Sequence, residues 1–303
     1  EIREAAARIS PYVRRTPLMA LGGPAPCELK LEYLQRTGSF KARGAFNTVL
    51  ASTVPAAGVT AASGGNHGVA VAHAANALGH RAAVFVPEIV SPTKRAAIEA
   101  EGADIHIGGA RYADALAACE AHQKRTGAMG IHAYDAALTV AGQGTVAAEW
   151  EHDTDGLDTV LVAVGGGGLI TGMAAWFGHR VRVVGVEPAG SRALHDALAS
   201  GGPIDVDVES IAADSLGAKR TGDLNFAIAA AHVDKVVLVD DPAIEAAQRA
   251  LWHSARIMTE PGGAAAFAAL LLGAYQPLPN ERVGVLVCGA NTTLDAFGAA
   301  LAR

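Results

Sequence analysis

The chain has 303 residues, of which 50% are hydrophobic and 18% charged, and its formal net charge is -6. This length allows one large or two smaller hydrophobic cores, and the negative charge argues against nucleic-acid binding, which needs a basic surface. The apolar runs are shorter than the roughly 18–20 residues of a membrane span, and the charged start, EIREAAARIS, does not resemble a signal peptide.

The three cysteines, Cys27, Cys119 and Cys288, are too few and too scattered for a disulfide framework or a zinc site. Such sparse cysteine use fits a reducing compartment. We therefore expect a cytoplasmic protein that binds neither nucleic acid nor a membrane.

Short β-rich runs alternate with alanine-rich helical stretches along almost the whole sequence. Several of these runs are continuously apolar, as expected for strands buried on both faces of a parallel sheet. One helical pattern extends from Arg111 to Gly127, where Lys124, Arg125 and the glycine form a helix stop. The expected strands are Glu28–Leu34, Val59–Ala62, Arg81–Val86, Asp104–Ile107, Thr159–Val164, Val181–Val186, Lys235–Val239 and Arg282–Val287.

This alternation predicts an α/β fold of the doubly wound type. One self-contained series of strand–helix pairs extends from Ala57 to Ile131, and a second series begins near Leu157. We therefore expect two α/β lobes, with a ligand bound outside the carboxyl ends of the strands, in the cleft between the lobes.

Lys41 lies in the segment Thr37–Ala45 (TGSFKARGA), directly before an apolar helical run. The positive end of a helix disfavours a lysine, so charge alone does not explain this position. A desolvated lysine would have a lowered pKa and would be a good amine nucleophile toward an aldehyde. The segment by itself is equally compatible with a solvated surface lysine.

Two glycine-rich turns each follow an apolar strand and precede a helix. The first, Ser63–Gly68 (SGGNHG), presents backbone N–H groups suited to a carboxylate or a phosphate, and Asn66 adds a side-chain amide. His67 in this turn fits a structural role better than that of a catalytic base. The second turn, Gly165–Gly168, can close around a phosphate at the start of the next helix.

The second turn also raises the alternative of a dinucleotide site, because Glu187 ends the following strand where such a site places an acid for the ribose. The glycine spacing does not match this motif. The position that should carry a glycine or alanine for close helix–strand packing is Ile170 or Thr171, depending on which glycine starts the count. A nicotinamide-dependent dehydrogenase is therefore the weaker interpretation.

Cys288 ends a further apolar strand, in the segment Val283–Leu294 (VGVLVCGANTTL). Taken in order, Ser39-Phe40-Lys41, the SGGNHG turn, the four glycines and the CGAN strand end resemble the fold type II pyridoxal-phosphate enzymes. Within this group they most resemble the threonine/serine dehydratases and serine racemase. The resemblance covers the chain from about Thr16 to its end.

The resemblance implies a tryptophan-synthase-β-like fold, in which two doubly wound α/β lobes hold the cofactor in the cleft between them. The large, cofactor-binding domain would comprise residues 1–55 and 134–303, and the small domain residues 56–133. The resemblance also implies assembly as a homodimer.

Each matching residue acquires an implied role. Lys41 would hold pyridoxal 5'-phosphate as a Schiff base and would remove the α-proton of the substrate. Phe40 would flank the cofactor ring, Asn66 would hydrogen-bond its hydroxyl oxygen, and Cys288 would face its nitrogen. The phosphate would be bound by Gly165, Gly166, Gly167 and Gly168. The substrate carboxylate would be bound by Ser63, Gly64, Gly65, Asn66 and His67.

The implied activity is β-elimination from a β-hydroxy L-amino acid, such as L-threonine or L-serine, to a 2-oxo acid and ammonia. Amino-acid racemisation is the alternative within the family. A neutral thiol at the ring nitrogen cannot stabilise a positive charge as an aspartate would, which disfavours a long-lived carbanion and favours loss of the β-hydroxyl. Racemisation also needs an acid on the face opposite Lys41, and Gly64 stands where serine racemase has a serine.

The sequence departs from the family pattern at Ala213-Asp214-Ser215, where the family has Ala-Asp-Gly near the substrate, and this puts the shape of the β-substituent pocket in doubt. The metal site of some relatives would begin at Glu187, but its aspartate partner aligns with Ala193, so we expect no metal site. Glu260 matches a glutamate near the active site, and the sequence assigns it no role.

Overall fold

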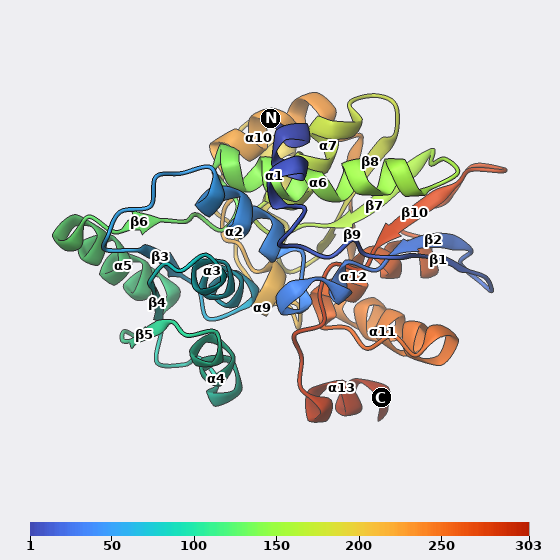
Figure 1. Cartoon of the computed structure of the whole chain (residues 1–303). Helices are drawn as coiled ribbons and strands as arrows, with labels where there is room; N and C mark the ends of the chain where they lie inside the picture. Colours follow the sequence, from blue (N-terminus) through green and yellow to red (C-terminus); the bar gives the residue numbers. More distant parts are fainter. Residues whose placement is uncertain (303) are drawn as a thin grey trace.

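The computed structural model describes residues 1–302, which form two separate sheets with helices packed on them (Figure 1). The larger sheet has six strands in the order β1-β2-β10-β7-β8-β9, and the smaller has four in the order β5-β4-β3-β6. Every pairing is parallel except that of β1 with β2, which is antiparallel. The predicted α/β fold with two parallel sheets is confirmed.

The larger sheet combines strands from both ends of the chain, because β10 lies between β2 and β7. Its strands are β1 (Leu18–Leu21), β2 (Cys27–Lys30), β7 (Thr159–Ala163), β8 (Arg182–Pro188), β9 (Lys235–Val239) and β10 (Val283–Leu286). Helices before β3 or after β6 are α1 (Ile2–Ile9), α2 (Lys41–Leu50), α6 (Ala137–Asp153), α7 (Gly168–Phe177), α8 (Ala193–Ser200), α9 (Ala213–Leu216), α10 (Asp223–His232), α11 (Asp241–Ala255), α12 (Pro261–Leu271) and α13 (Leu294–Ala302). Two 3-10 turns, η1 (Glu32–Leu34) and η2 (Arg36–Gly38), connect β2 to α2.

The smaller sheet, on the left in Figure 1, is formed by one continuous part of the sequence. Its strands are β3 (Val59–Ala62), β4 (Ala82–Val86), β5 (Asp104–Ile107) and β6 (Met129–Gly130). Its helices are α3 (Asn66–Ala77), α4 (Pro92–Ala100) and α5 (Tyr112–Thr126). This sheet lies inside the range predicted for the small domain, whose boundaries at residues 56 and 133 stay a prediction.

All eight expected strands are present, and the helix stop at Gly127 is confirmed by its left-handed φ of 74°. The largest difference concerns Glu28–Leu34, where the strand ends at Lys30 and η1 follows. The turn in the chain points Glu32 into a buried ion pair, which a continued strand would not allow. The short strands β1 and β6 were not predicted.

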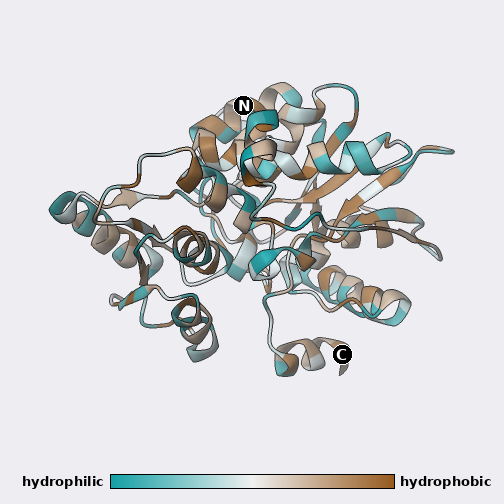
Figure 2. Cartoon of the chain, in the orientation of Figure 1, coloured by the Kyte–Doolittle hydropathy of each residue, from teal (hydrophilic) through white to brown (hydrophobic). Residues whose placement is uncertain are grey.

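The core forms where apolar strands meet apolar helices. Every residue of β7 (TVLVA) and of β3 (VTAA) is buried, as expected for central parallel strands covered on both faces. Figure 2 shows the strands of the larger sheet and helix α3 mostly in the brown of hydrophobic residues. Within residues 1–302, no helix has the length and apolarity to cross a membrane.

A buried ion cluster fixes helix α2 against its neighbours. Arg43 pairs with Glu32 of η1 at 2.6 Å and with Glu149 of α6 at 2.9 Å, and Glu149 in turn accepts from Lys30 of β2 at 2.7 Å. Lys30, Glu32 and Arg43 are all buried. Because a buried charge without a partner is costly, each member of the cluster depends on the others.

We expect the substitution Arg43→Met to lower the free energy of unfolding by about 3–5 kcal/mol, because it leaves the buried carboxylate of Glu32 and the half-buried carboxylate of Glu149 without their shared partner. The matched control is Arg15→Met, since Arg15 pairs with Asp153 but keeps 56% of its side chain exposed, and its loss should cost only about 0–1 kcal/mol. Urea unfolding followed by tryptophan fluorescence measures both. Equal losses in the two variants would contradict the importance of the cluster.

Candidate active site

Lys41 begins α2 beside the carboxyl end of β10. The backbone N–H of Phe40 donates to the carbonyl of Cys288 at 3.2 Å, and Ser39 forms an isolated bridge with Gly289. The predicted lysine and the predicted cysteine, which lie far apart in the sequence, are therefore neighbours in the fold.

The amine of Lys41 has a neutral partner. Its Nζ donates to the carbonyl of Ala133 at 2.7 Å and lies 5.1 Å from the centre of the Phe40 ring. Burial of the amine lowers the pKa of Lys41 to about 8, against smaller opposing effects of Cys288 and Glu260. No carboxylate among residues 1–302 accepts a hydrogen bond from this amine. Lys41 is therefore a nucleophile that is partly neutral near physiological pH.

The turn Ser63–Gly68 ends β3 and opens α3. The backbone N–H groups of Gly64, Asn66 and His67 have no acceptor within residues 1–302, so they are available to an anion. Gly68 keeps the turn tight, since a Cβ there would lie 2.1 Å from the carbonyl oxygen of Ser63.

The imidazole of His67 is engaged elsewhere. Its Nε2 hydrogen-bonds to the carbonyl of Ile131 at 2.8 Å, and burial, together with nearby Lys41, lowers its pKa to about 3. The ring is therefore neutral, and the residue offers a ligand its backbone N–H.

The four glycines after β7 form a second group of unpaired donors. The backbone N–H groups of Gly165–Gly168 make no hydrogen bond within residues 1–302, although Gly167 and Gly168 are buried. Gly167 has a φ of 100°, which an L side chain rarely adopts. A Cβ on Gly166 would lie 2.3 Å from the ring of Tyr134, which packs on the turn. Buried N–H groups without acceptors are costly unless an anionic ligand completes them.

A chain of hydrogen bonds connects the first turn to the larger sheet. Asn66 donates from Nδ2 to Glu260 at 2.7 Å and accepts from Asn291 at 2.6 Å. Burial raises the pKa of Glu260 to about 7, although the hydrogen bond from Asn66 opposes this shift. Asn66 is thereby held from two segments of the larger domain.

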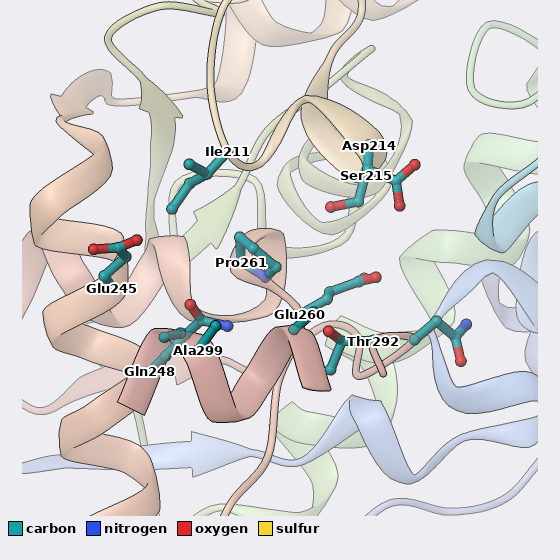
Figure 3. Close-up of a pocket in the computed structure, with 12 residues that line it drawn as sticks. Ile211, Asp214, Ser215, Glu245, Gln248, Glu260, Pro261, Thr292 and Ala299 are labelled. Carbon is teal, nitrogen blue, oxygen red and sulfur yellow. The ribbon is translucent and has the colours of Figure 1, made fainter. Parts of the chain in front are cut away.

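A cavity of about 290 Å³ adjoins Glu260 (Figure 3). In this view Glu260 extends toward the side of the cavity where Asp214, Ser215 and Thr292 lie, whereas Glu245 lies on the opposite side. The lining residues are Ile211, Asp214, Ser215, Glu245, Gln248, Glu260, Pro261, Asn291, Thr292, Ala296, Ala299 and Ala300.

Cys288 is a buried, neutral thiol. Its Sγ lies 3.6 Å from the carbonyl oxygen of Gly262, and burial raises its pKa to about 12. Glu260 acts in the same direction. A thiol in this setting stays protonated and cannot serve as a counter-ion.

Glu187 lies away from these groups and caps a helix. Its carboxylate accepts the backbone N–H groups of Leu194 at 2.9 Å and His195 at 2.8 Å, at the start of α8. Burial raises the pKa of Glu187 to about 8. Across residues 1–302, no three His, Cys, Asp or Glu side chains are grouped so as to hold a metal ion.

Several residues of the site were not singled out from the sequence. The carbonyl of Ala133 and the side chains of Asn225 and Thr221 belong to no recognisable motif. Asn291 was noted in the sequence only as part of the CGAN segment, and its hydrogen bond to Asn66 was not predicted. Only the folded chain brings these groups to the turns.

The comparisons with known proteins agree with this geometry. Residues 9–289 match the family model described as "Pyridoxal-phosphate dependent enzyme". Phenylserine dehydratase of Ralstonia pickettii is 37% identical and is matched over 96% of this chain and 92% of its own. L-threonine ammonia-lyase of Geobacter sulfurreducens is 36% identical, over 100% of this chain and 77% of its own. The structure of maize serine racemase has a TM-score of 0.92 at 32% identity, covering 99% of this chain and 95% of that chain.

In the cofactor-free protein, we expect the rate at which Lys41 reacts with an amine-directed reagent, such as acetic anhydride, to rise with pH and to level off above about 8. Only the neutral amine is nucleophilic, and burial lowers the pKa, so the neutral form is reached about two pH units earlier than for an ordinary lysine. Peptide mapping by mass spectrometry measures the rate, with free lysine in the same solution as the reference. A rate for Lys41 that parallels free lysine would contradict the burial of the amine.

Proposed function

The chain belongs to the pyridoxal-phosphate dependent enzymes, and from this premise we propose that Lys41 is the residue that binds the cofactor. The enzyme is an ammonia-lyase of the threonine/serine dehydratase type, which converts a β-hydroxy L-amino acid to a 2-oxo acid and ammonia. The observation that carries the proposal for Lys41 is its buried amine, which has a carbonyl and no carboxylate as its partner.

The residues of the site fit pyridoxal 5'-phosphate. Lys41 offers an amine to an aldehyde, and the unpaired N–H groups of Gly165–Gly168 offer donors to a phosphate. When bound, the cofactor supplies the aldehyde and a ring that takes up the electrons left on the substrate Cα. A dinucleotide is the poorer fit, in agreement with the family match to pyridoxal-phosphate enzymes.

We propose that the substrate carboxylate binds to the backbone N–H groups of the turn Ser63–Gly68. Lys41 would serve as the base for the α-proton of the substrate, because its lowered pKa lets it accept and give up a proton near neutral pH. Cys288 would face the ring nitrogen as a neutral thiol, so it would supply no counter-charge there. The favoured reaction would then be elimination, in which the α-proton taken by Lys41 and the β-hydroxyl together leave the substrate as water.

Racemisation is the second candidate, because maize serine racemase is similar in sequence and structure. Gly64 argues against it, since it has no side chain to donate a proton on the face opposite Lys41. Val90 also fills the space beside Gly64, where a Cβ would lie 2.6 Å from its Cγ2. Assembly as a homodimer stays a prediction.

Borohydride reduction of the loaded enzyme should fix the cofactor on Lys41, as found by mass spectrometry. The variant Lys41→Ala should carry no label and should release no 2-oxo acid or ammonia from a panel of L-threonine, L-serine, a 3-phenylserine and a 3-hydroxyaspartate. The control Lys124→Ala, in the exposed last turn of α5, should behave as the wild type. A label on Lys30 or Lys94 would show that the assignment of Lys41 is wrong.

Wild-type protein should convert L-serine to pyruvate with little D-serine, as measured by chiral chromatography. Gly64→Ser together with Val90→Ala should raise the fraction of D-serine, because it supplies a hydroxyl and the space to hold it. Gly64→Ser alone should be less effective, since Val90 obstructs the new side chain, and Val90→Ala alone should leave the fraction unchanged. D-serine forming as fast as pyruvate in the wild type would overturn the preference for elimination.

A further inference from the structure

Asn225 lies at the start of α10, and its fully buried side chain uses both ends of its amide. Its Nδ2 donates to the carbonyl of Gly166 at 2.9 Å and to that of Tyr134 at 3.1 Å. Its Oδ1 accepts from the hydroxyl of Thr171, in α7, at 2.9 Å. One side chain thus joins the glycine turn, the helix that follows it and the loop before α6.

The bond to Gly166 determines where the next N–H group points. The carbonyl of Gly166 and the N–H of Gly167 belong to one peptide plane, and in a trans peptide they point in opposite directions. Asn225, assisted by the hydroxyl of Thr221 at 3.3 Å, holds this carbonyl on the protein side. The N–H of Gly167 is therefore turned the other way, and it has no acceptor within residues 1–302.

The bond to Tyr134 connects the same amide to the loop before α6, which also contains the hydrogen-bond acceptor of Lys41. The neighbouring Ala133 accepts from Lys41, and the backbone N–H of Asn225 donates to the carboxylate of Asp135 at 3.3 Å. The ring of Tyr134 also packs on Gly166. Asn225 thus fixes the position of the glycine turn relative to the loop that contains Ala133, the acceptor of the Lys41 amine.

We propose that Asn225 is a positioning residue for the cofactor phosphate, which it serves by aiming the N–H of Gly167 at that phosphate. The proposal rests on the function proposed above, in which the glycine turn holds the phosphate of pyridoxal 5'-phosphate. It requires a side chain that donates twice at this place. An aspartate has the same shape but no donor, and it would face two carbonyl oxygens.

The test compares the apoprotein's affinity for pyridoxal 5'-phosphate with its affinity for pyridoxal, which has the same ring and aldehyde but no phosphate. Asn225→Asp should weaken binding of pyridoxal 5'-phosphate about tenfold or more and should change binding of pyridoxal little. Asn225→Ala, which introduces no buried charge, should show the same selective loss. Absorbance titration gives both affinities, and circular dichroism reports that each variant is folded. The exposed Asn76→Asp is the matched control and should bind both ligands as the wild type does.

Gly167→Ala separates this inference from the function on which it rests. A side chain at its φ of 100° distorts the turn directly, so this variant should also lose affinity for the phosphate form alone. If it does, while both Asn225 variants bind pyridoxal 5'-phosphate normally or lose both ligands equally, the role of Asn225 is overturned and the proposed function stands. If neither Gly167→Ala nor the Asn225 variants lose affinity for the phosphate form selectively, the glycine turn is not the phosphate site. The assignment of the phosphate to Gly165–Gly168 and the role of Asn225 are then both wrong.

Discussion

The chemistry proposed for this protein depends on one amine that has no carboxylate partner within residues 1–302. Lys30 and Arg43 are buried as well, but each is paired with a glutamate. Within residues 1–302, the hydrogen-bond acceptor of the Lys41 amine is the neutral carbonyl of Ala133, so no paired opposite charge offsets its desolvation and its pKa falls. The same stretch of chain therefore holds a structural cation and a reactive amine two residues apart, distinguished by their partners.

The same constraint fits the composition of the two proposed anion sites, which consist of peptide groups. An arginine or lysine beside Lys41 would bind a phosphate or a carboxylate, but its charge would also act on the amine. The turns Ser63–Gly68 and Gly165–Gly168 provide unpaired N–H groups at helix starts, which attract anions without a full charge. Buried side chains such as Asn225 then orient the peptides.

Local patterns in the sequence sufficed for the central strands and the two glycine turns, because apolar runs and glycines act within a few residues. Features set by distant contacts could not be predicted. Glu32 lies in a 3-10 turn because it meets Arg43, and no local preference marks it as the end of a strand. Asn225 stands in an ordinary helical stretch, and Val90 covers Gly64 from the loop before α4. The contacts of these three residues are made with parts of the chain that are distant in sequence, so they can be identified only in the folded structure.

The hydrogen bonds around Asn66 limit what this residue can offer a ligand. Its Oδ1 is occupied by Asn291, and one of the two hydrogens on Nδ2 is donated to Glu260. One hydrogen on Nδ2 remains free of these two bonds, so Asn66 can act on a ligand as a donor. This suits an electron-rich oxygen, such as that of the cofactor's ring hydroxyl, the partner that the sequence resemblance implies for Asn66. Because Glu260 and Asn291 belong to the larger domain while Asn66 opens α3 of the smaller one, the direction of that N–H depends on how the two domains meet.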